Sequence, residues 1–198
     1  MKLPESFYVQ QDVVQIAKDL LGKYLFTSID GVLTSGIITE TEAYAGITDK
    51  ASHAYGDRRT PRTEVMYHQG GLAYIYLCYG MYSLFNVVTN VKGIPHAVLI
   101  RAMVPIDGIE AIKKRCKQSD LLKYPINGPG KLCKALGIHY SLSGTDLQGH
   151  QIWIEDKQLD VNEENILISS RIGIAYAKED ALLPYRFILK YSEIKKTK

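Results

Sequence analysis

The chain is poor in the groups that hold disulfides, metals or nucleotide phosphates. Its 198 residues include three cysteines, none of them in a CxxC pair, at Cys78, Cys116 and Cys133. This usage argues against a disulfide framework and favours a reducing, cytoplasmic setting. The five histidines show neither HxxxH nor HExxH spacing, and neither a Walker A loop nor a Gly-x-Ser-x-Gly elbow occurs. We therefore expect neither a metal ion nor a cofactor.

Charge is missing from one long stretch. Residues 65–91 contain no Asp, Glu, Lys or Arg but five tyrosines. The stretch is long enough for a membrane span. However, polar residues such as Gln69 and Asn86 interrupt it, and its tyrosines alternate instead of forming a belt. Residues 1–8 also lack the apolar core of a signal peptide. We expect no contact with a membrane.

The overall composition is that of a soluble globular protein. The apolar fraction is 46% and the net charge is +3, so any affinity for phosphate must come from local clusters of basic residues. One such cluster is Arg58, Arg59 and Arg62. The length suits one domain, which we place at residues 1–192. Residues 193–198 are expected to form a disordered basic tail, and the protein is expected to be a monomer.

Hydrophobic periodicity predicts more strands than helices. Asp30-Gly31 is a hairpin signal between the first two strands. Helices are expected at 12–22, 106–118 and 131–136, and loops at 45–71 and 139–150. Strands are expected at 23–28, 32–41, 72–79, 84–90, 96–103, 151–155, 166–169 and 186–190. Because the strands mostly follow one another in sequence, the pattern indicates an α+β fold: a single mixed domain with a curved, largely antiparallel β-sheet and peripheral helices.

Two acids and an aromatic residue meet where a strand gives way to a loop. If alternation holds, Glu40, Glu42 and Tyr44 point to one face. The simplest alternative is that both glutamates are solvated on an exposed strand. The loop that follows carries His53 and the arginine cluster, which could equally be ordinary surface residues.

Polar and aromatic residues in the next strands are further candidates. Tyr74 and Tyr76 share a strand face and could simply pack half-buried, as strand tyrosines often do. Tyr79, at the strand end before a glycine, could instead project outward. Asn86 and Arg101 interrupt apolar strands, so each must be hydrogen-bonded or face a cavity. A buried arginine needs an anionic partner, and Glu42 is the obvious one.

At these residues the sequence resembles the alkyladenine (3-methyladenine) DNA glycosylase family, the type without a helix-hairpin-helix. The resemblance covers roughly residues 8–190. Its motifs are Glu40-Thr41-Glu42-Ala43-Tyr44, His53, Arg59-Thr60-Pro61-Arg62, Tyr74 through Tyr82, Asn86, Val98 through Ala102, Gly128-Pro129-Gly130-Lys131-Leu132, Arg171-Ile172-Gly173 and Pro184-Tyr185-Arg186-Phe187.

The resemblance implies a monofunctional glycosylase that detaches damaged purines from double-stranded DNA. Glu42 would be the base that activates water at the mouth of a tyrosine-walled slot, and Arg101 would hold the water or orient Glu42. The slot would be lined by Tyr44, His53, Tyr76 and Asn86. Tyr79 would intercalate in the duplex, while Arg58, Arg59 and Arg62 would contact phosphates. The substrates would be 3-methyladenine and 7-methylguanine, with hypoxanthine and ethenoadenine left open.

Two other functions fit parts of the pattern. A damage-binding module without catalysis would have no use for the pair formed by Glu42 and Arg101. A glycosidase acting on free nucleosides would need neither a basic loop nor an exposed Tyr79, because its small substrate has no duplex to open.

Overall fold

The structure is a computed structural model that describes residues 1–117 and 125–190. The expected tail at 193–198, and the end of the helix expected at 106–118, lie outside these residues. The helices are α1 (Glu5–Tyr8), α2 (Val13–Asp19), α3 (Ile109–Cys116) and α4 (Pro129–Leu136). The strands are β1 (Tyr24–Ile29), β2 (Val32–Tyr44), β3 (Ala73–Cys78), β4 (Tyr82–Thr89), β5 (His96–Pro105), β6 (Ile126–Asn127), β7 (Ile152–Glu155), β8 (Ile166–Ser169) and β9 (Arg186–Leu189).

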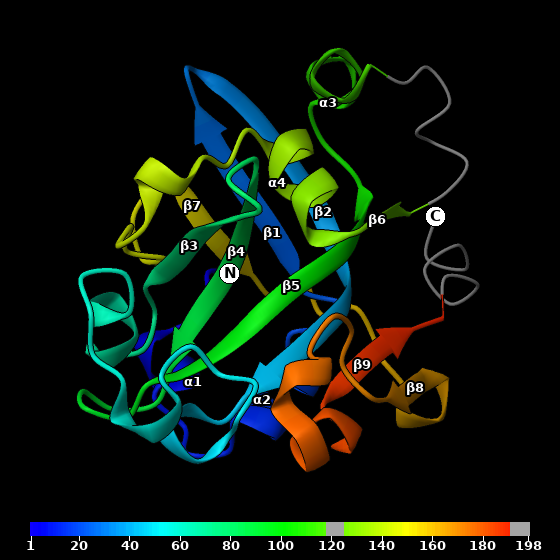
Figure 1. Ribbon diagram of the computed structural model, residues 1–198. Helices are drawn as coiled ribbons and strands as arrows, with labels where there is room; N and C mark the ends of the chain where they lie inside the picture. The colour runs from blue at the N-terminus through cyan, green and yellow to red at the C-terminus, as the bar shows by residue number, and fades with distance from the viewer. Residues whose placement is uncertain (118–124, 191–198) are drawn as a thin grey trace.

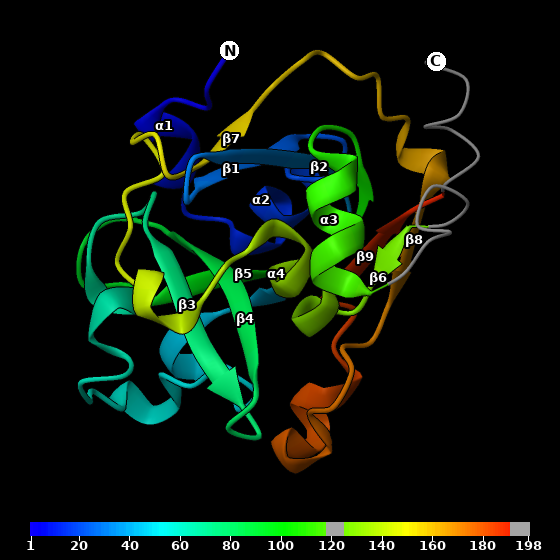
Figure 2. The same ribbon diagram turned by 90° about the horizontal axis from the view of Figure 1, so that it is seen from above.

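The main sheet has the strand order β3-β4-β5-β2-β1-β7, and every pairing among the described residues is antiparallel. β6 pairs with β5, while β9 joins β2 and carries β8 on its other side. The sheet curls strongly, as the view from above shows (Figure 2). The expected α+β fold with a curved antiparallel sheet is therefore confirmed.

Local signals in the sequence explain where several elements begin and end. The Asp12 carboxylate accepts hydrogen bonds from two amides of the first turn of α2, which makes it the N-cap. Asp30 and Gly31 both have positive φ, as a tight hairpin between β1 and β2 requires. α4 begins at Pro129, two residues before its predicted start, since proline fits the first helical position.

The long central strand β2 positions the site. It runs three residues beyond its predicted end, so Glu42 lies inside a strand. β1 pairs with it up to Ile37, β9 takes over from Glu40, and β5 follows the opposite edge with register shifts on both sides of Glu40. The Thr41 hydroxyl donates to the Ala17 carbonyl of α2. Since neighbouring strand residues point to opposite faces, the glutamates face away from α2.

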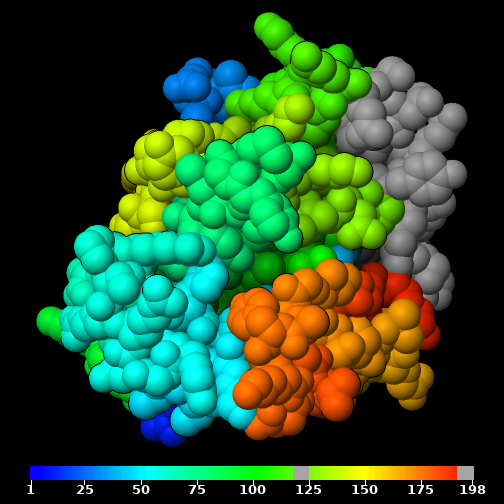
Figure 3. All heavy atoms as spheres, viewed as in Figure 1, coloured from blue at the N-terminus to red at the C-terminus, as the bar shows by residue number. Residues whose placement is uncertain are grey.

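Short 3-10 turns connect the longer elements. η1 (Gly46–Thr48), η2 (Tyr55–Asp57), η3 (Glu64–Tyr67) and η5 (Tyr140–Leu142) lie in the two segments expected to be loops, while η6 (Glu163–Asn165) and η7 (Ala175–Leu182) lie between the later strands. α4 packs against β4 and β5, while α2 packs against β2 and β5 (Figure 1). The surface is hollowed where residues 45–65, the β3–β4 hairpin and η7 approach one another (Figure 3). Segments distant in sequence thus meet around one cavity.

Candidate active site

The cavity has a volume of about 490 Å³, within the usual range for small-molecule sites. Its walls come from the end of β2, the 51–66 segment, β3, β4, β5, the start of α4 and residues 172–176. Of the residues predicted to lie in the site, it is lined by Tyr44, His53, Arg62, Tyr76, Tyr79, Asn86 and Arg101.

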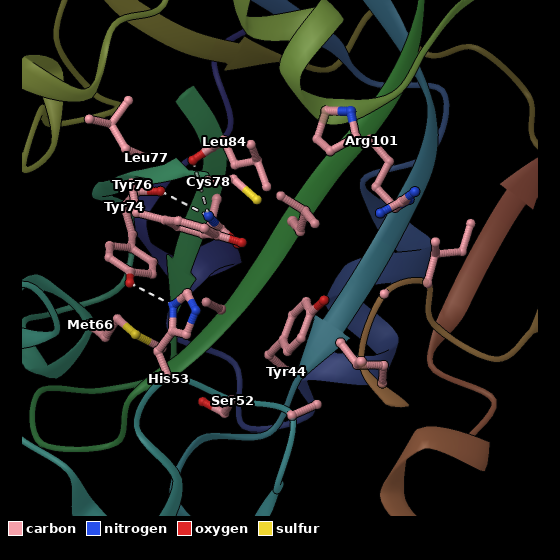
Figure 4. Close-up of a pocket in the computed structure, with 18 of the residues that line it drawn as sticks. Tyr44, Ser52, His53, Met66, Tyr74, Tyr76, Leu77, Cys78, Leu84 and Arg101 are labelled. Carbon is pink, nitrogen blue, oxygen red and sulfur yellow. Dashed lines mark hydrogen bonds between the residues drawn. The ribbon is translucent and has the colours of Figure 1, made fainter. Parts of the chain in front are cut away.

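Aromatic rings form two opposing walls of the cavity. Tyr44 lies on one side, and His53, Tyr74 and Tyr76 lie on the other (Figure 4). The Tyr74 and Tyr76 ring centroids are 5.5 Å apart, which confirms that the two tyrosines share a strand face. The His53 ring meets Tyr76 edge-on at 4.6 Å. A flat ring system entering the cavity would therefore find aromatic surface on both sides.

His53 is held as a neutral ring. Burial, together with the nearby charges of Arg62 and Arg58, lowers the pKa of His53 to about 4. Its Nδ1 lies 2.8 Å from the Tyr74 hydroxyl, and its Nε2 lies 3.2 Å from Arg62 Nη2. Because a guanidinium only donates, Nε2 is the acceptor and the ring proton sits on Nδ1, where it is donated to Tyr74.

The three arginines assigned to phosphates lie in different surroundings. Arg62 points into the cavity, where its guanidinium carbon lies 4.8 Å from the Tyr76 ring centroid. Arg59 forms two hydrogen bonds of 2.7 and 2.8 Å with the Glu64 carboxylate and covers the Tyr67 ring. Arg58 is exposed. The structure thus adds a cavity position for Arg62 that its place in the sequence did not predict.

Glu42 differs in one respect from expectation. Its side chain is fully buried and is not part of the cavity wall, so its predicted position at the mouth of the slot is wrong. It contacts three residues that do line the cavity. Its Oε1 accepts from the Ile172 amide at 2.8 Å and lies 3.4 Å from Arg101 Nη1, and its Oε2 accepts from the Tyr44 hydroxyl at 2.8 Å. The carboxylate lies directly behind the wall.

A compact group of charges surrounds this carboxylate. Arg101 Nε donates to Glu40 Oε1 at 2.8 Å, so its nearer partner is Glu40, not Glu42 as expected. Arg186, opposite Glu42 on β9, donates to the same Glu40 oxygen at 2.6 Å. Both glutamates are buried, which excludes the solvated alternative and confirms that they share a face with Tyr44. Two carboxylates and two guanidinium groups thus balance each other in and behind the wall.

Burial is the largest influence on the pKa of the Glu42 carboxyl and raises it above its ordinary value. Arg101, the Ile172 amide and the Tyr44 hydroxyl act in the opposite direction, because they favour the ionised form. Burial and the Glu42 charge raise the pKa of Tyr44 well above normal, so this tyrosine is a hydrogen-bond donor at neutral pH. A carboxylate whose pKa is raised in this way is a better general base than an exposed one.

Asn86 is held rigidly beside the aromatic rings. It is buried on β4, and its Nδ2 donates to the backbone carbonyls of Tyr74 at 3.0 Å and Leu84 at 3.4 Å. These bonds account for the polar side chain in an apolar strand. They also prevent Asn86 from moving aside for a ligand.

Tyr79 stands at the rim, at the tip of the β3–β4 hairpin. It is 88% exposed, which confirms that it projects from the strand end, and its φ of 51° is in the left-handed region that tyrosine rarely adopts. Met81 beside it is 71% exposed. Two large apolar side chains thus reach solvent on a strained turn, an arrangement often found at functional sites.

Several lining residues escaped the sequence analysis as site residues. They are Tyr74, Tyr176, Met66, Pro129 and the segment from Ile172 to Ile174. Tyr74 was a candidate through its alternation with Tyr76, and Pro129, Ile172 and Gly173 lie in motifs that carry the family resemblance. Tyr176, Met66 and Ile174 come from segments without a local signal. Within residues 1–117 and 125–190, no group of three or more His, Cys, Asp or Glu is arranged to hold a metal ion. No helix there is long and apolar enough to cross a bilayer.

A cavity of this size with ionisable groups of shifted pKa in and behind its wall is a candidate active site. The comparisons with known proteins give the family. Residues 6–193 match the family described as Methylpurine-DNA glycosylase (MPG), and the chain belongs to this family of DNA N-glycosylases, which act in base excision repair.

Similar proteins cover nearly the whole chain. A protein of Chlamydia felis (strain Fe/C-56) is 48% identical over 98% of this chain and 99% of its own length. Proteins of Chlamydia abortus (strain DSM 27085 / S26/3) and Bacillus cereus (strain ZK / E33L) are 49% and 48% identical, each over 94% of this chain and over 97% and 95% of their own lengths. All three carry the name "Putative 3-methyladenine DNA glycosylase".

Proposed function

We propose that this chain hydrolyses the N-glycosidic bond of alkylated purines in duplex DNA, with Glu42 as the general base. The observation that carries the proposal is the contact between the Glu42 carboxylate and three residues of the aromatic cavity wall: Tyr44, Arg101 and Ile172. A site that only binds damaged DNA has no need of a buried carboxylate whose pKa is raised.

The cavity and the hairpin tip together suit a flipped base. A purine inside a duplex is out of reach, so it must turn outward at a cost of a few kcal/mol. Tyr79, at the exposed tip, would enter the space that the base leaves and offset part of this cost. Stacking between Tyr44 on one side and Tyr76 with His53 on the other would return roughly 1–3 kcal/mol.

Charge would select the lesion. Alkylated purines such as 3-methyladenine and 7-methylguanine are cationic, and the face of a tyrosine ring attracts cations. In the free protein that face of Tyr76 is covered by the Arg62 guanidinium. An entering cationic base would displace Arg62, which would then be free to contact the DNA backbone. Asn86, held by two backbone carbonyls, could not yield to the exocyclic amine of normal guanine.

The proposed reaction needs one carboxylate. Water adds its oxygen to C1′ of the deoxyribose and gives its proton to Glu42, while the C1′–N bond breaks and its electron pair leaves with the purine. A cationic purine departs as a neutral base, so no acid is needed to protonate it. The Glu42 proton then passes to solvent. The nearby Arg101 would hold the attacking water, which would approach from the cavity past the half-exposed Ile172.

The test is a comparison of the two neighbouring glutamates. Glu42→Gln keeps the shape of the side chain but removes the base, so base release should fall at least about 100-fold while binding of a lesion duplex is retained. Duplexes with one defined lesion each, followed by alkaline cleavage at abasic sites, measure release under single-turnover conditions. Glu40→Gln is the control, since Glu40 contacts arginines behind the wall. Undiminished release by Glu42→Gln would reject Glu42 as the base.

A further inference from the structure

One buried ion pair joins the segments that enclose Glu42. Arg171 and Asp49 are 5% and 3% exposed. Arg171 Nη2 donates to Asp49 Oδ1 at 2.8 Å, and Nη1 donates to the other carboxylate oxygen. Such a bidentate salt bridge fixes the orientation of both side chains as well as their separation. The pair lies 122 residues apart in sequence, so it fastens two distant parts of the chain to each other.

The remaining bonds of this pair reach the neighbours of Glu42. Arg171 Nη1 also donates to the Ala43 carbonyl at 2.8 Å, and the guanidinium carbon lies 4.8 Å from the Tyr44 ring centroid. Asp49 accepts from the Ala45 amide at 3.1 Å. The backbone is therefore held directly before and directly after Tyr44, whose hydroxyl bonds to Glu42.

The same pair holds the second donor to Glu42. The Ile172 amide, which donates to Glu42 Oε1, belongs to the residue directly after Arg171. Arg171 Nη2 also donates to the Asp180 carbonyl in η7, which anchors the far end of this segment. The Tyr44 hydroxyl and the Ile172 amide are the two neutral groups that donate to the Glu42 carboxylate. Both are thus held in place by the same guanidinium, that of Arg171.

We propose that Arg171 and Asp49 form a positioning clamp that sets the Tyr44 hydroxyl and the Ile172 amide on the Glu42 carboxylate for base release. The clamp lies outside the cavity lining. It acts by keeping two hydrogen bonds in place, and it rests on the proposed role of Glu42 as base. A displacement of about 1 Å at a reacting group can cost as much as 100-fold in rate.

The acid side of the pH–rate profile distinguishes a clamp from mere structural support. Glu42 must be ionised to accept a proton, so release falls as pH drops through the pKa of Glu42. Loss of the Ile172 and Tyr44 hydrogen bonds would raise this pKa further, because both favour the ionised form. The other charged or titratable groups facing Glu42 are Glu40 from β2, Arg101 from β5, Arg186 from β9, and Arg171 and Tyr176 from the 171–176 segment.

The experiment compares this buried pair with an exposed neighbour. Lys50 and Glu179 form an ion pair between the same two segments, but their side chains are 30% and 66% exposed. Asp49→Asn and Arg171→Lys should lower single-turnover release roughly 10- to 100-fold, with lesion-duplex binding changed less than about threefold and the acid limb moved to higher pH. Lys50→Gln should leave the rate and the acid limb unchanged.

A double variant guards against loss of folding. Asp49→Asn/Arg171→Gln removes both charges, so no unpaired charge is left buried, and its fold is checked by circular dichroism and thermal melting. Slow release with a shifted acid limb in this folded variant supports the clamp. An unshifted acid limb, with a rate that simply follows the folded fraction, overturns it. Full release by Glu42→Gln would instead reject the proposed base, which separates the two failures.

Discussion

The two sides of the cavity hold their charges in opposite ways. On the β2–β5–β9 side, Glu40 and Glu42 are buried with Arg101, and both carboxylates accept hydrogen bonds from fixed groups of the protein. On the side of the 57–62 loop, Arg59 and its partner Glu64 have side chains 55% and 45% exposed. Breaking a buried ion pair is strongly destabilising, because it leaves an uncompensated charge inside the protein. An exposed arginine, in contrast, can exchange its carboxylate partner for a DNA phosphate. The first side is suited to chemistry and the second to contact with DNA.

The largest expected effect is on stability, at the buried side. Arg101→Met would leave two buried carboxylates short of a cation and lower the free energy of unfolding by about 3–5 kcal/mol. The loss should shrink at acid pH, where the carboxyls take up protons. Urea unfolding measures it. Arg59→Met, the matched change on the exposed side, should leave the midpoint unchanged. Equal losses in the two variants would contradict the contrast drawn between the two sides.

The hairpin tip should show a trade-off between stability and function. Tyr79→Asn places a residue that tolerates positive φ at a position with φ of 51°. The free energy of unfolding, measured by thermal melting, should therefore rise by about 1 kcal/mol. The same change removes the aromatic ring, so discrimination between lesion and normal duplex should weaken in competition binding. Tyr79→Phe, which keeps the ring, is the control. If Tyr79→Asn discriminates as well as the parent, Tyr79 does not act as a wedge.

The exposed arginines should determine how binding depends on salt. If Arg58 contacts a phosphate, Arg58→Gln should reduce the slope of log affinity against log salt by about one, and equally for lesion and normal duplexes. Fluorescence anisotropy over a range of salt concentrations measures the slope. Lys190→Gln, directly after β9 and away from the cavity lining, should leave it unchanged. A slope that is the same in both variants would remove Arg58 from the phosphate contacts.

The smallest expected effect concerns His53 and pH. Its pKa falls from 6.5 in the unfolded chain to about 4 in the fold, mainly through burial. The unfolded state therefore binds the proton first, so this part of the stability is present above pH 6.5 and is lost as pH falls toward about 4. His53→Gln should lose less stability across that interval than the parent, as measured by thermal melting. An identical pH dependence would mean that His53 is not held neutral.

The sequence predicted the strands better than it predicted where the site's charges lie. Period-2 alternation correctly placed Tyr74 with Tyr76 and Glu40 with Glu42. The domain assignment and the roles of the site residues stay predictions. Burial was harder to foresee, because an alternating strand has the same pattern whether its polar face meets water or another segment. The wall that covers Glu42 comes from residue 172, more than a hundred positions away.

The order of elements, their turns and the residue types capable of chemistry were determined by the sequence alone, because alternation, capping and turn preferences are local. Only the tertiary structure decided that Arg101 bonds first to Glu40, that Arg62 lies on Tyr76, and that Arg171 and Asp49 join the two segments beside Glu42. These pairings depend on how β3, β5, the 57–62 loop and the segment that leads into η7 close around the end of β2. Long-range closure is set by packing of the whole core, and no short stretch of sequence contains it.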